Sequence, residues 1–366
     1  MRSNTESGPL LVTKKDLRKK RCNKFLKIGF FLTLLSAGTM NYAIGAEIPL
    51  ASDWEDQGTV IAPGSSGSWD VRVGGSITPG TVIKKGGTYF LYYVGADGDR
   101  STDGGPRHRA LGVATSEDGI HFTKYSGNPI ITYLPNNNEE EGVFSAAATL
   151  DDAGNVVLYY SACNAGSQTS ESVTCAGFVA TSANGLDFVE QGTVLSPGDS
   201  SVWGYGDELF PVGTFHTGST WYLYYIAKGV AATWDLGLAS GSSFDNLANT
   251  QAILTDGSYI VGGLDPVALS PNQLAVFVVR DFASWITEVR TTTPSNPAAL
   301  SAPVVTYDMD NVKHVTPFFD SSTDTWYMYY LNAAENAIGV MTTGSPPATS
   351  APDTTPPDIP GQLLAE

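Results

Sequence analysis

The sequence predicts an all-β protein, a five-bladed β-propeller closed by an N-terminal strand. Three observations support this prediction. The composition favours strands and turns, with 39 Gly, 21 Pro and 11% aromatic residues against only 16% charged residues. An aromatic strand recurs five times, and a string that follows the second of these strands is repeated near the N-terminus. The same composition excludes a disordered tail or a coiled coil, both of which are rich in charge and poor in aromatics.

The repeated strand is a run of about five residues rich in Tyr, Phe and Trp. It occupies residues 89–93, 156–160, 221–225, 274–278 and 326–330. Each copy is followed by a shorter alternating segment, such as 111–116 after the first copy and 177–182 after the second. Paired strands of this kind predict one small sheet for each repeat, and a series of such sheets indicates a propeller.

The N-terminal segment is expected to complete the last sheet. Residues 188–198 read Phe-Val-Glu-Gln-Gly-Thr-Val-Leu-Ser-Pro-Gly, and residues 54–64 read Trp-Glu-Asp-Gln-Gly-Thr-Val-Ile-Ala-Pro-Gly. The fifth repeat lacks such an element at its C-terminal end, so the N-terminal copy should pair there and remove a free sheet edge. We therefore predict a propeller domain over residues 47–345. The alternative is a β-sandwich whose strands are similar by accident.

Both ends of the chain predict segments outside this domain. Residues 1–46 have the pattern of a secretory signal peptide, with basic residues up to Lys27, an apolar run over 28–35 and small residues up to Ala46. The apolar run is shorter than the ~20 residues that span a bilayer, so we expect cleavage rather than anchoring. The mature protein should be secreted or periplasmic, with no stable membrane association. Residues 346–366 predict a Pro/Thr-rich linker, to which additional modules could be attached.

The charge distribution argues against nucleic acid as a partner. Nine of the 20 Lys and Arg but only two of the 37 Asp and Glu lie in residues 1–46. The remaining chain has 11 basic and 35 acidic residues, a net charge near −24. Such a surface repels phosphate backbones and anionic membranes.

Two cysteines remain after removal of the signal peptide. Cys163 and Cys175 flank a polar stretch where two strands of a hairpin should face each other. In an exported protein this arrangement predicts a disulfide. A metal pair or a reactive thiol is the alternative, but the spacing is not CxxC and no histidine accompanies it.

Ionisable and aromatic residues gather near the starts of the first strands of the repeats, where a propeller brings its sheets together around a central channel. The charged candidates are Asp70 and Arg72 in the first repeat, Asp207 and Glu208 in the third, Asp265 and Arg280 in the fourth, and His314 in the fifth. Trp69 and Trp203 are aromatic candidates for stacking on a ligand. Each acid taken alone could equally be a turn or capping residue.

Several carboxyl groups at one opening suit glycoside hydrolysis. That reaction needs one carboxyl group that stays protonated and another that is ionised, and neighbouring negative charges separate their pKa values in this way. The sequence therefore predicts a glycoside hydrolase acting on plant or algal saccharides, and a saccharide is the expected partner. Arg72 and Arg280 would orient the substrate or balance the acids.

Three strings carry a resemblance to a known family. Gly-Ser-Trp-Asp at 67–70, the aromatic strand at 89–95 and Leu-Gly-Val-Ala-Thr-Ser-Glu-Asp-Gly at 111–119 resemble the five-bladed propeller glycosidases of the family 43 and family 32 superfamily. The resemblance spans roughly residues 52–345. Similarity to family 43 implies that Asp70 is a general base, that Asp207 orients the substrate and tunes pKa values, and that Asp265 or Glu208 is the proton donor. We expect cleavage by inversion, with Asp70 as the base.

The sequence departs from this family in two places. The first repeat has no Asp-Pro pair, and Asp265 stands where family 43 has Glu. The Asn-Asp-Pro-Asn-Gly string of family 32 is missing, which argues against fructan cleavage. His314 resembles either a histidine of the central channel or the histidine implicated in acid catalysis in family 117.

No cofactor and no metal site is predicted, although the acids would allow calcium in the central channel. Two alternatives stay open. A glycan phosphorylase or transferase would need clustered basic residues to hold phosphate, and few are found among the candidates. A carbohydrate-binding propeller without catalysis would use the same aromatic residues for stacking, with structural acids.

Overall fold

The described part of the chain is almost entirely β-strand. The computed structural model describes residues 46–71, 77–97, 108–132, 141–165, 173–198, 208–228, 234–255, 257, 264–280, 285–334 and 336–344, all within the unit Ala37–Glu366. Within these ranges the one helical segment is a short 3₁₀ turn, η1 (Ala51–Asp53). No helix among these residues has the length and apolar character needed to cross a membrane.

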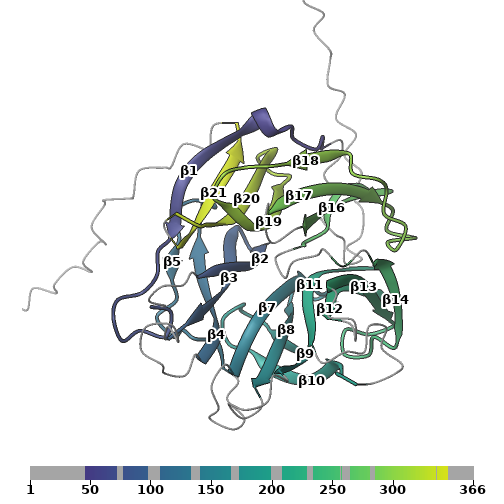
Figure 1. Ribbon diagram of the computed structural model, residues 1–366, viewed down its shortest axis with the longest axis horizontal. Coiled ribbons are helices and arrows are strands. Elements are labelled where there is room, and N and C mark those ends of the chain that lie inside the picture. The colour runs from purple at the N-terminus through teal and green to yellow at the C-terminus, as the bar shows by residue number, and fades with distance from the viewer. Residues whose placement is uncertain are drawn as a thin grey trace, which may run out of the picture. The chain divides into compact units, whose positions relative to one another are not determined.

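The described strands form three sheets of 4, 13 and 4 strands. Within the 13-stranded sheet, two parallel pairs join three antiparallel runs. We therefore divide the strands, labelled in Figure 1, into five antiparallel groups. Group 1 comprises β2 (Thr78–Lys85), β3 (Thr88–Ala96) and β4 (His108–Ser116), with β5 (Thr123–Lys124) and β6 (Ile131–Thr132) paired to β4. Group 2 comprises β7 (Glu141–Leu150), β8 (Val156–Ala165), β9 (Val173–Ser182) and β10 (Val189–Leu195). Group 3 comprises β11 (Glu208–Thr217), β12 (Thr220–Lys228), β13 (Trp234–Gly241) and β14 (Asn249–Leu254).

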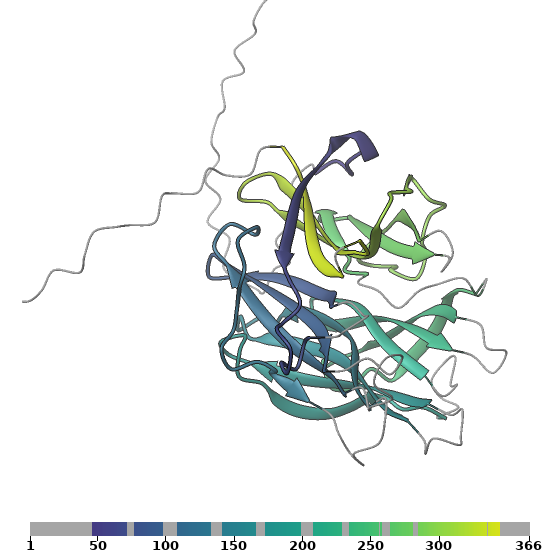
Figure 2. The same cartoon turned by 60° about the vertical axis from the view of Figure 1, so that its left-hand side comes forward.

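The last two groups have the same antiparallel order. Group 4 comprises β15 (Val267–Ser270), β16 (Gln273–Arg280), β17 (Ile286–Thr292) and β18 (Val305–Tyr307). Group 5 comprises β19 (Val312–Asp320), β20 (Thr325–Asn332) and β21 (Ala337–Thr343). Its fourth strand is β1 (Trp54–Ile61), which pairs antiparallel with β21. The pairing is visible in two views as the purple strand beside the yellow one (Figures 1 and 2).

Alternation along the second strand of each group explains why the strands are apolar on both sides. Successive side chains of a strand point to opposite faces of its sheet. On β3, Tyr89, Leu91 and Tyr93 pack against group 5, whereas Tyr92 and Val94 pack against group 2. Group 1 therefore buries both faces, and its second strand has no solvent-facing side.

The hydrophobic core is divided among the spaces between neighbouring groups. In the described residues, separate buried clusters join groups 1 and 2, groups 2 and 3, groups 3 and 4, groups 4 and 5, and groups 5 and 1. Every group thus contacts two others. At roughly 25 cal/mol per Å² of apolar area removed from water, these interfaces are the main source of stability.

At four of these interfaces, a tyrosine of the second strand of one group bonds to the next group. It is the fourth residue of the repeated aromatic run, and its hydroxyl donates to a backbone carbonyl in a turn of the next group. The pairs are Tyr92 with Gly185 (3.0 Å), Tyr159 with Phe244 (2.9 Å), Tyr224 with Pro297 (2.9 Å) and Tyr329 with Gly119 (2.8 Å). Burial raises the pKa of each of these tyrosines, so they remain donors.

Group 4 lacks this bond for a simple chemical reason. Its residue at the same position is Phe277, which has no hydroxyl group. Phe277 instead stacks on Tyr307 of its own group, with ring centroids 6.2 Å apart, and contacts Trp326 of group 5. The interface between groups 4 and 5 is therefore held by aromatic packing.

The turns that accept these bonds require glycine at two positions. Gly119 and Gly185 follow β4 and β9, with φ of +78° and +79°. A Cβ atom at Gly119 would lie 2.8 Å from the Tyr327 ring, and one at Gly185 would lie 2.9 Å from the Phe90 ring. Glycine therefore allows both the left-handed backbone and the close approach of the neighbouring group.

The predicted disulfide is confirmed. Cys163 and Cys175 are directly opposite each other on β8 and β9, with Cα atoms 4.0 Å apart. Both are fully buried in the cluster that joins groups 3 and 4, next to Phe210 and Val212. The bond closes a loop over a separation of 12 residues, which contributes roughly 3 kcal/mol in the chain-entropy model.

Removal of one cross-group hydroxyl should destabilise the protein. In Tyr224→Phe the carbonyl of Pro297 loses its buried donor, at a cost of roughly 1–3 kcal/mol. Tyr222→Phe is the matched control, because Tyr222 lies on the same strand as Tyr224, stacks on Phe215 of β11 and makes no such bond among the described residues. We expect chemical denaturation to show a lower unfolding free energy for Tyr224→Phe alone. Equal losses in both variants would contradict this role.

Candidate functional site

The first strands of groups 1, 2, 3 and 5 run in the same direction and so define two ends. β4 pairs parallel with β7, and β9 pairs parallel with β11, which makes β2, β7 and β11 parallel to one another. β19 runs in the same direction as β2. Thr316 donates to the Gly80 carbonyl, and four residues further along both strands Lys84 pairs with Asp320. We call the end where the first strands begin the start end, and the end where they turn into the second strands the turn end.

Three candidate residues lie outside the described residues. They are Arg72, Trp203 and Asp207, and their roles stay predictions. The remaining candidates are Trp69, Asp70, Glu208, Asp265, Arg280 and His314.

Asp70 is buried and fully engaged. Its carboxylate lies 2.6 Å from Lys124 Nζ and accepts hydrogen bonds from Tyr93 (3.2 Å) and Ser68 (3.0 Å). Its side chain is 4% exposed, whereas that of Lys124 is 35% exposed. This arrangement neutralises a buried charge and anchors the segment before β2 on group 1.

Trp69 holds the same segment against the sheet. Its ring packs on Tyr93, with centroids 5.5 Å apart. A Cβ atom at Gly112 would lie 2.5 Å from the Trp69 ring, and one at Gly95 would lie 2.7 Å from it. The glycines of β3 and β4 therefore provide the space for this tryptophan.

Glu208 and Arg280 are both in ion pairs at the start end. Glu208 is the first residue of β11 and pairs with Lys228, whose ammonium also lies 5.4 Å from the centroid of the Trp234 ring. Arg280 is the last residue of β16 and pairs with Glu288 at 3.0 Å. Both charged groups are thus compensated by a neighbour on the adjacent strand.

His314 lies in an irregular part of β19. Its φ of +46° is unusual for a residue other than glycine, and the register of β19 with β20 shifts between Lys313 and Thr316. The imidazole contacts Trp285 of group 4, with ring centroids 4.8 Å apart. His314 therefore lies where groups 4 and 5 meet.

Asp265 differs from the other acids because no basic residue pairs with it among the described residues. It directly precedes Pro266 and is 8% exposed. Its Oδ2 accepts a hydrogen bond from the Thr81 hydroxyl of β2 (2.7 Å), whereas its buried Oδ1 has no hydrogen-bond partner in the described structure. Thr81 in turn accepts a bond from the backbone N–H of Ala148 on β7 (3.3 Å). A side chain of group 4 is thus linked to groups 1 and 2.

The surroundings of Asp265 raise the pKa of its carboxyl group. Burial raises its pKa well above the usual value, and the hydrogen bonds from Thr81 and from the Val82 backbone offset this only in part. Burial thus favours the protonated form of Asp265, the form that can donate a proton.

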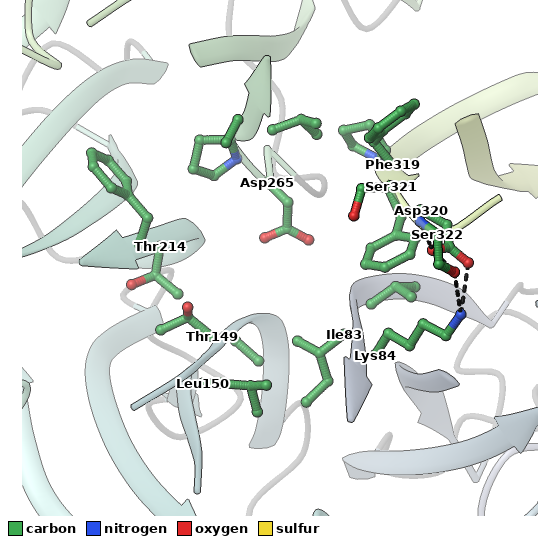
Figure 3. A pocket seen from close by; sticks show the side chains of 18 of the residues that line it. Ile83, Lys84, Thr149, Leu150, Thr214, Asp265, Phe319, Asp320, Ser321 and Ser322 are labelled. Carbon is green, nitrogen blue, oxygen red and sulfur yellow. Dashed lines mark hydrogen bonds and ion pairs between the residues drawn. The ribbon is translucent and has the colours of Figure 1, made fainter. Parts of the chain in front are cut away.

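A cavity of about 560 Å³ lies beside Asp265 (Figure 3). Its walls come from the later parts of β2, β7, β11 and β19 and from the start of β15, so it faces the turn end. Among the sequence-predicted residues that the structure describes, only Asp265 lines it. Asp70 and Glu208 do not, and the structure does not bring these two acids to the same cavity wall as Asp265.

Two further ionisable residues of the cavity were not predicted from the sequence. Lys84 of β2 and Asp320 of β19 form an ion pair at 2.7 Å, and Asp320 also accepts hydrogen bonds from Tyr89 and Ser322. Burial by itself would raise the pKa of Asp320, but the bonds from Lys84, Ser322 and Tyr89 lower it to about 2. Both residues lie at the turn end, whereas the candidates from the sequence lie before the first strands.

A metal centre finds no support in the described residues, which contain no group of three His, Cys, Asp or Glu suited to hold a metal ion. His216 lines the cavity, but its Nε2 donates to the Leu150 carbonyl (2.9 Å) and its ring stacks on Trp221. The expectation of calcium in the central channel is not tested by these observations.

Comparison with known proteins identifies the fold. No protein-family model matches the chain, and no curated protein matches it by sequence. Among solved structures it is similar to the β-1,2-mannobiose phosphorylase from Listeria innocua (14% identity, 82% of this chain and 94% of that one, TM-score 0.53). It is also similar to a family 117 glycoside hydrolase from the marine bacterium Zobellia galactanivorans (16% identity, 79% and 90% coverage, TM-score 0.54).

A third similar structure belongs to a study of the GH130 family of mannoside phosphorylases, which contains glycoside hydrolases that target β-1,2-mannosidic linkages in Candida mannan. The identity is 14%, the coverage 83% of this chain and 95% of that one, and the TM-score 0.55. These likenesses confirm, at the level of the fold, the resemblance to propeller glycosidases noted in the sequence.

The contacts of Asp70 generate a test of its structural role. In Asp70→Asn the bond to Lys124 loses its negative charge, so we expect a fall in unfolding free energy toward the lower end of the roughly 1.5–3 kcal/mol of a hydrogen bond to a charged group. Asp97→Asn is the control, because Asp97 is 39% exposed in its pair with His108 and should cost at most about 1 kcal/mol. Thermal melting of both variants measures the difference. An unchanged melting temperature for Asp70→Asn would show that the carboxylate does not stabilise the fold. Only its predicted catalytic role would then remain.

Proposed function

We propose that the chain is a closed five-bladed β-propeller and a glycan-active enzyme. Five successive groups of antiparallel strands, buried clusters between each pair of neighbours and the pairing of β1 with β21 support the closed ring. The mannoside phosphorylase and glycoside hydrolases of similar fold support activity on saccharides. Fold by itself does not define an activity, so the proposal depends on a specific side chain.

That side chain is Asp265, which carries a carboxyl. Glycoside cleavage needs an acid that is still protonated near neutral pH and gives its proton to the leaving oxygen. Burial raises the pKa of Asp265, which favours the neutral form, and among the described residues no basic residue pairs with it and one of its oxygens has no hydrogen-bond partner. We assign Asp265 as the proton donor, one of the two candidates from the sequence. The other, Glu208, is ion-paired with Lys228.

The remaining roles rest on the sequence resemblance. Asp70 would be the general base, and Asp207 would orient the substrate and tune pKa values, with cleavage by inversion. Inversion requires the two catalytic carboxyl groups to be about 6.5–9.5 Å apart, with room for a water molecule between them. The tight bonding of Asp70 to Lys124 is the main physical argument against its role as base.

Hydrolysis fits the cavity better than phosphorolysis. A phosphate ion needs uncompensated basic groups. Among the described lining residues, Lys84 is the one Lys or Arg, and its charge is balanced by Asp320. A dependence of turnover on phosphate would nevertheless favour the phosphorylase alternative, and binding without new reducing ends would favour a carbohydrate-binding propeller.

We also propose that the protein is exported. The signal-like segment 1–46 and the linker-like segment 346–366 lie outside the described residues. The buried disulfide of Cys163 and Cys175 supports an oxidising compartment, where such bonds form and persist.

Asp265→Asn tests the proton donor. The variant keeps the shape and hydrogen-bonding capacity of the side chain but cannot give up a proton, so release of reducing sugar should fall at least about 100-fold. Activity is measured on arabinan, xylan, agar, mannan and fructan, with and without phosphate. Wild-type turnover of none of them would remove the proposed activity, and full activity of Asp265→Asn would remove the assignment.

The same variant has a predicted effect on stability. Because the folded pKa of Asp265 is raised, the folded protein binds more protons than the unfolded chain above about pH 3.9, and wild-type stability falls as pH rises from there toward the folded pKa. Asn carries no such cost. We therefore expect the melting temperature of Asp265→Asn to equal or exceed that of the wild type at pH 7, with a gap that is smaller at pH 4. A lower melting temperature at pH 7 would contradict the uncompensated burial.

A further inference from the structure

The turn between β9 and β10 contains the one Asn-Gly pair of the sequence, Asn184-Gly185. Asparagine followed by glycine is prone to deamidation, because glycine has no side chain to shield its backbone nitrogen. That nitrogen attacks the side-chain amide carbon of the asparagine, ammonia leaves, and water opens the resulting cyclic imide to aspartate or isoaspartate. Asn184 is exposed, so water reaches its side chain.

The folded turn holds both groups that must react. Oδ1 of Asn184 accepts hydrogen bonds from the backbone N–H groups of Leu186 and Asp187 (2.9 Å each) and a third from the Ser182 hydroxyl (2.9 Å). The N–H of Gly185 donates to the same hydroxyl oxygen (2.9 Å). Both Ser182 and Gly185 are buried. The attacking nitrogen is therefore hydrogen-bonded inside the turn and must be released before it can react.

Group 1 keeps this turn closed. The hydroxyl of Tyr92 donates to the Gly185 carbonyl (3.0 Å), and the Tyr92 ring contacts Phe188 edge to face, with centroids 5.8 Å apart. Release of the Gly185 nitrogen thus requires groups 1 and 2 to separate locally. Local opening of this kind has its own free energy, which is at most that of global unfolding. How often the turn opens should therefore limit the rate of deamidation in the folded protein.

A second turn of the same design shows what the aspartate product would meet. In the turn after β4, Asp118 occupies the position of Asn184, and its Oδ1 accepts bonds from the Ser116 hydroxyl (2.9 Å) and the backbone N–H groups of Ile120 (2.9 Å) and His121 (2.8 Å). The turn therefore accommodates an aspartate. Oδ2 of Asp118 lies 2.7 Å from Nδ1 of the His121 imidazole, which compensates the carboxylate when it is protonated.

The corresponding neighbour of Asn184 is itself a carboxylate. Nδ2 of Asn184 donates to Oδ2 of Asp187 (2.8 Å). Aspartate at position 184 would replace this donor by an oxygen and bring two negative charges into contact. Isoaspartate would add one atom to the backbone between positions 184 and 185 and displace the carbonyl that accepts the bond from Tyr92. Either product weakens the contact between groups 1 and 2.

We propose that Asn184 is a site of spontaneous deamidation, that the reaction proceeds through the opened turn, and that its products loosen the interface between groups 1 and 2. Water is the co-reactant and ammonia is released, so the step needs no oxidant, enzyme or bound ligand. The proposal is independent of any activity on saccharides.

Peptide-mapping mass spectrometry of the full chain, incubated in mildly alkaline buffer, tests the site and the route. Conversion of Asn184 should be at least about tenfold slower in the folded protein than in the same chain held unfolded in guanidinium. Ser182→Ala removes the oxygen that holds the Gly185 N–H and should accelerate conversion in the folded protein at least about fivefold. Ser116→Ala removes the same bonds from the turn of Asp118 and is the matched control, with an unchanged rate at Asn184.

Three results would contradict the proposal. Equal rates in the folded and unfolded chain would show that the turn does not control the reaction. Equal acceleration by Ser116→Ala and Ser182→Ala would assign the effect to general loss of stability. An unmodified Asn184 in the folded protein, after complete conversion in the unfolded chain, would exclude it as a modification site of the native protein.

Asn184→Asp reproduces one product and tests its effect on the interface. Its melting temperature should fall below that of the wild type, because two carboxylates meet in the turn. The double variant Asn184→Asp/Asp187→His installs the pair found at Asp118 and His121 and should recover most of the loss. Asp187→His alone is the control for the second substitution. A melting temperature of Asn184→Asp equal to that of the wild type, or a loss that Asp187→His does not reduce, would contradict the weakened interface.

Discussion

The tyrosine hydroxyl that crosses from one group of strands to the next is the interaction on which the arrangement depends. Apolar packing joins neighbouring groups without specifying how far one slides along the other, because hydrophobic attraction has no direction. A hydrogen bond from Tyr92, Tyr159, Tyr224 or Tyr329 to a single carbonyl sets that position. Each bond is short and each hydroxyl is buried, so a slipped arrangement would leave the carbonyl and the phenol unsatisfied.

This constraint positions the first strands, and with them the cavity. Thr81, Thr316 and Asp265 come from three different groups, yet Thr81 bonds to Asp265 and Thr316 donates to the Gly80 carbonyl. Such contacts exist only if the groups are held at a fixed distance and height. The interface of groups 4 and 5, where Phe277 replaces the tyrosine, depends instead on aromatic packing around Tyr307 and Trp326.

Three buried acids show how the same side chain acquires different chemistry. Asp70 is compensated by Lys124, and Asp320 is compensated by Lys84 and by hydroxyl donors. Asp265 receives a bond from Thr81 but meets no cation among the described residues. The pKa of Asp320 is therefore lowered and that of Asp265 is raised, although both residues line one cavity.

The repeated strands and the disulfide could be predicted from local patterns, because they depend on runs of aromatic residues and on two cysteines opposite each other in a hairpin. The sequence also singled out Asp265 as a candidate. The contacts of the ionisable residues depend on the fold as a whole: Asp70 pairs with Lys124, Thr81 bonds to Asp265 across 184 residues of sequence, and Lys84 pairs with Asp320 across 236. These contacts could not be predicted because the pKa of a carboxyl group depends on which distant donors and cations the fold brings to it, and no local pattern records them.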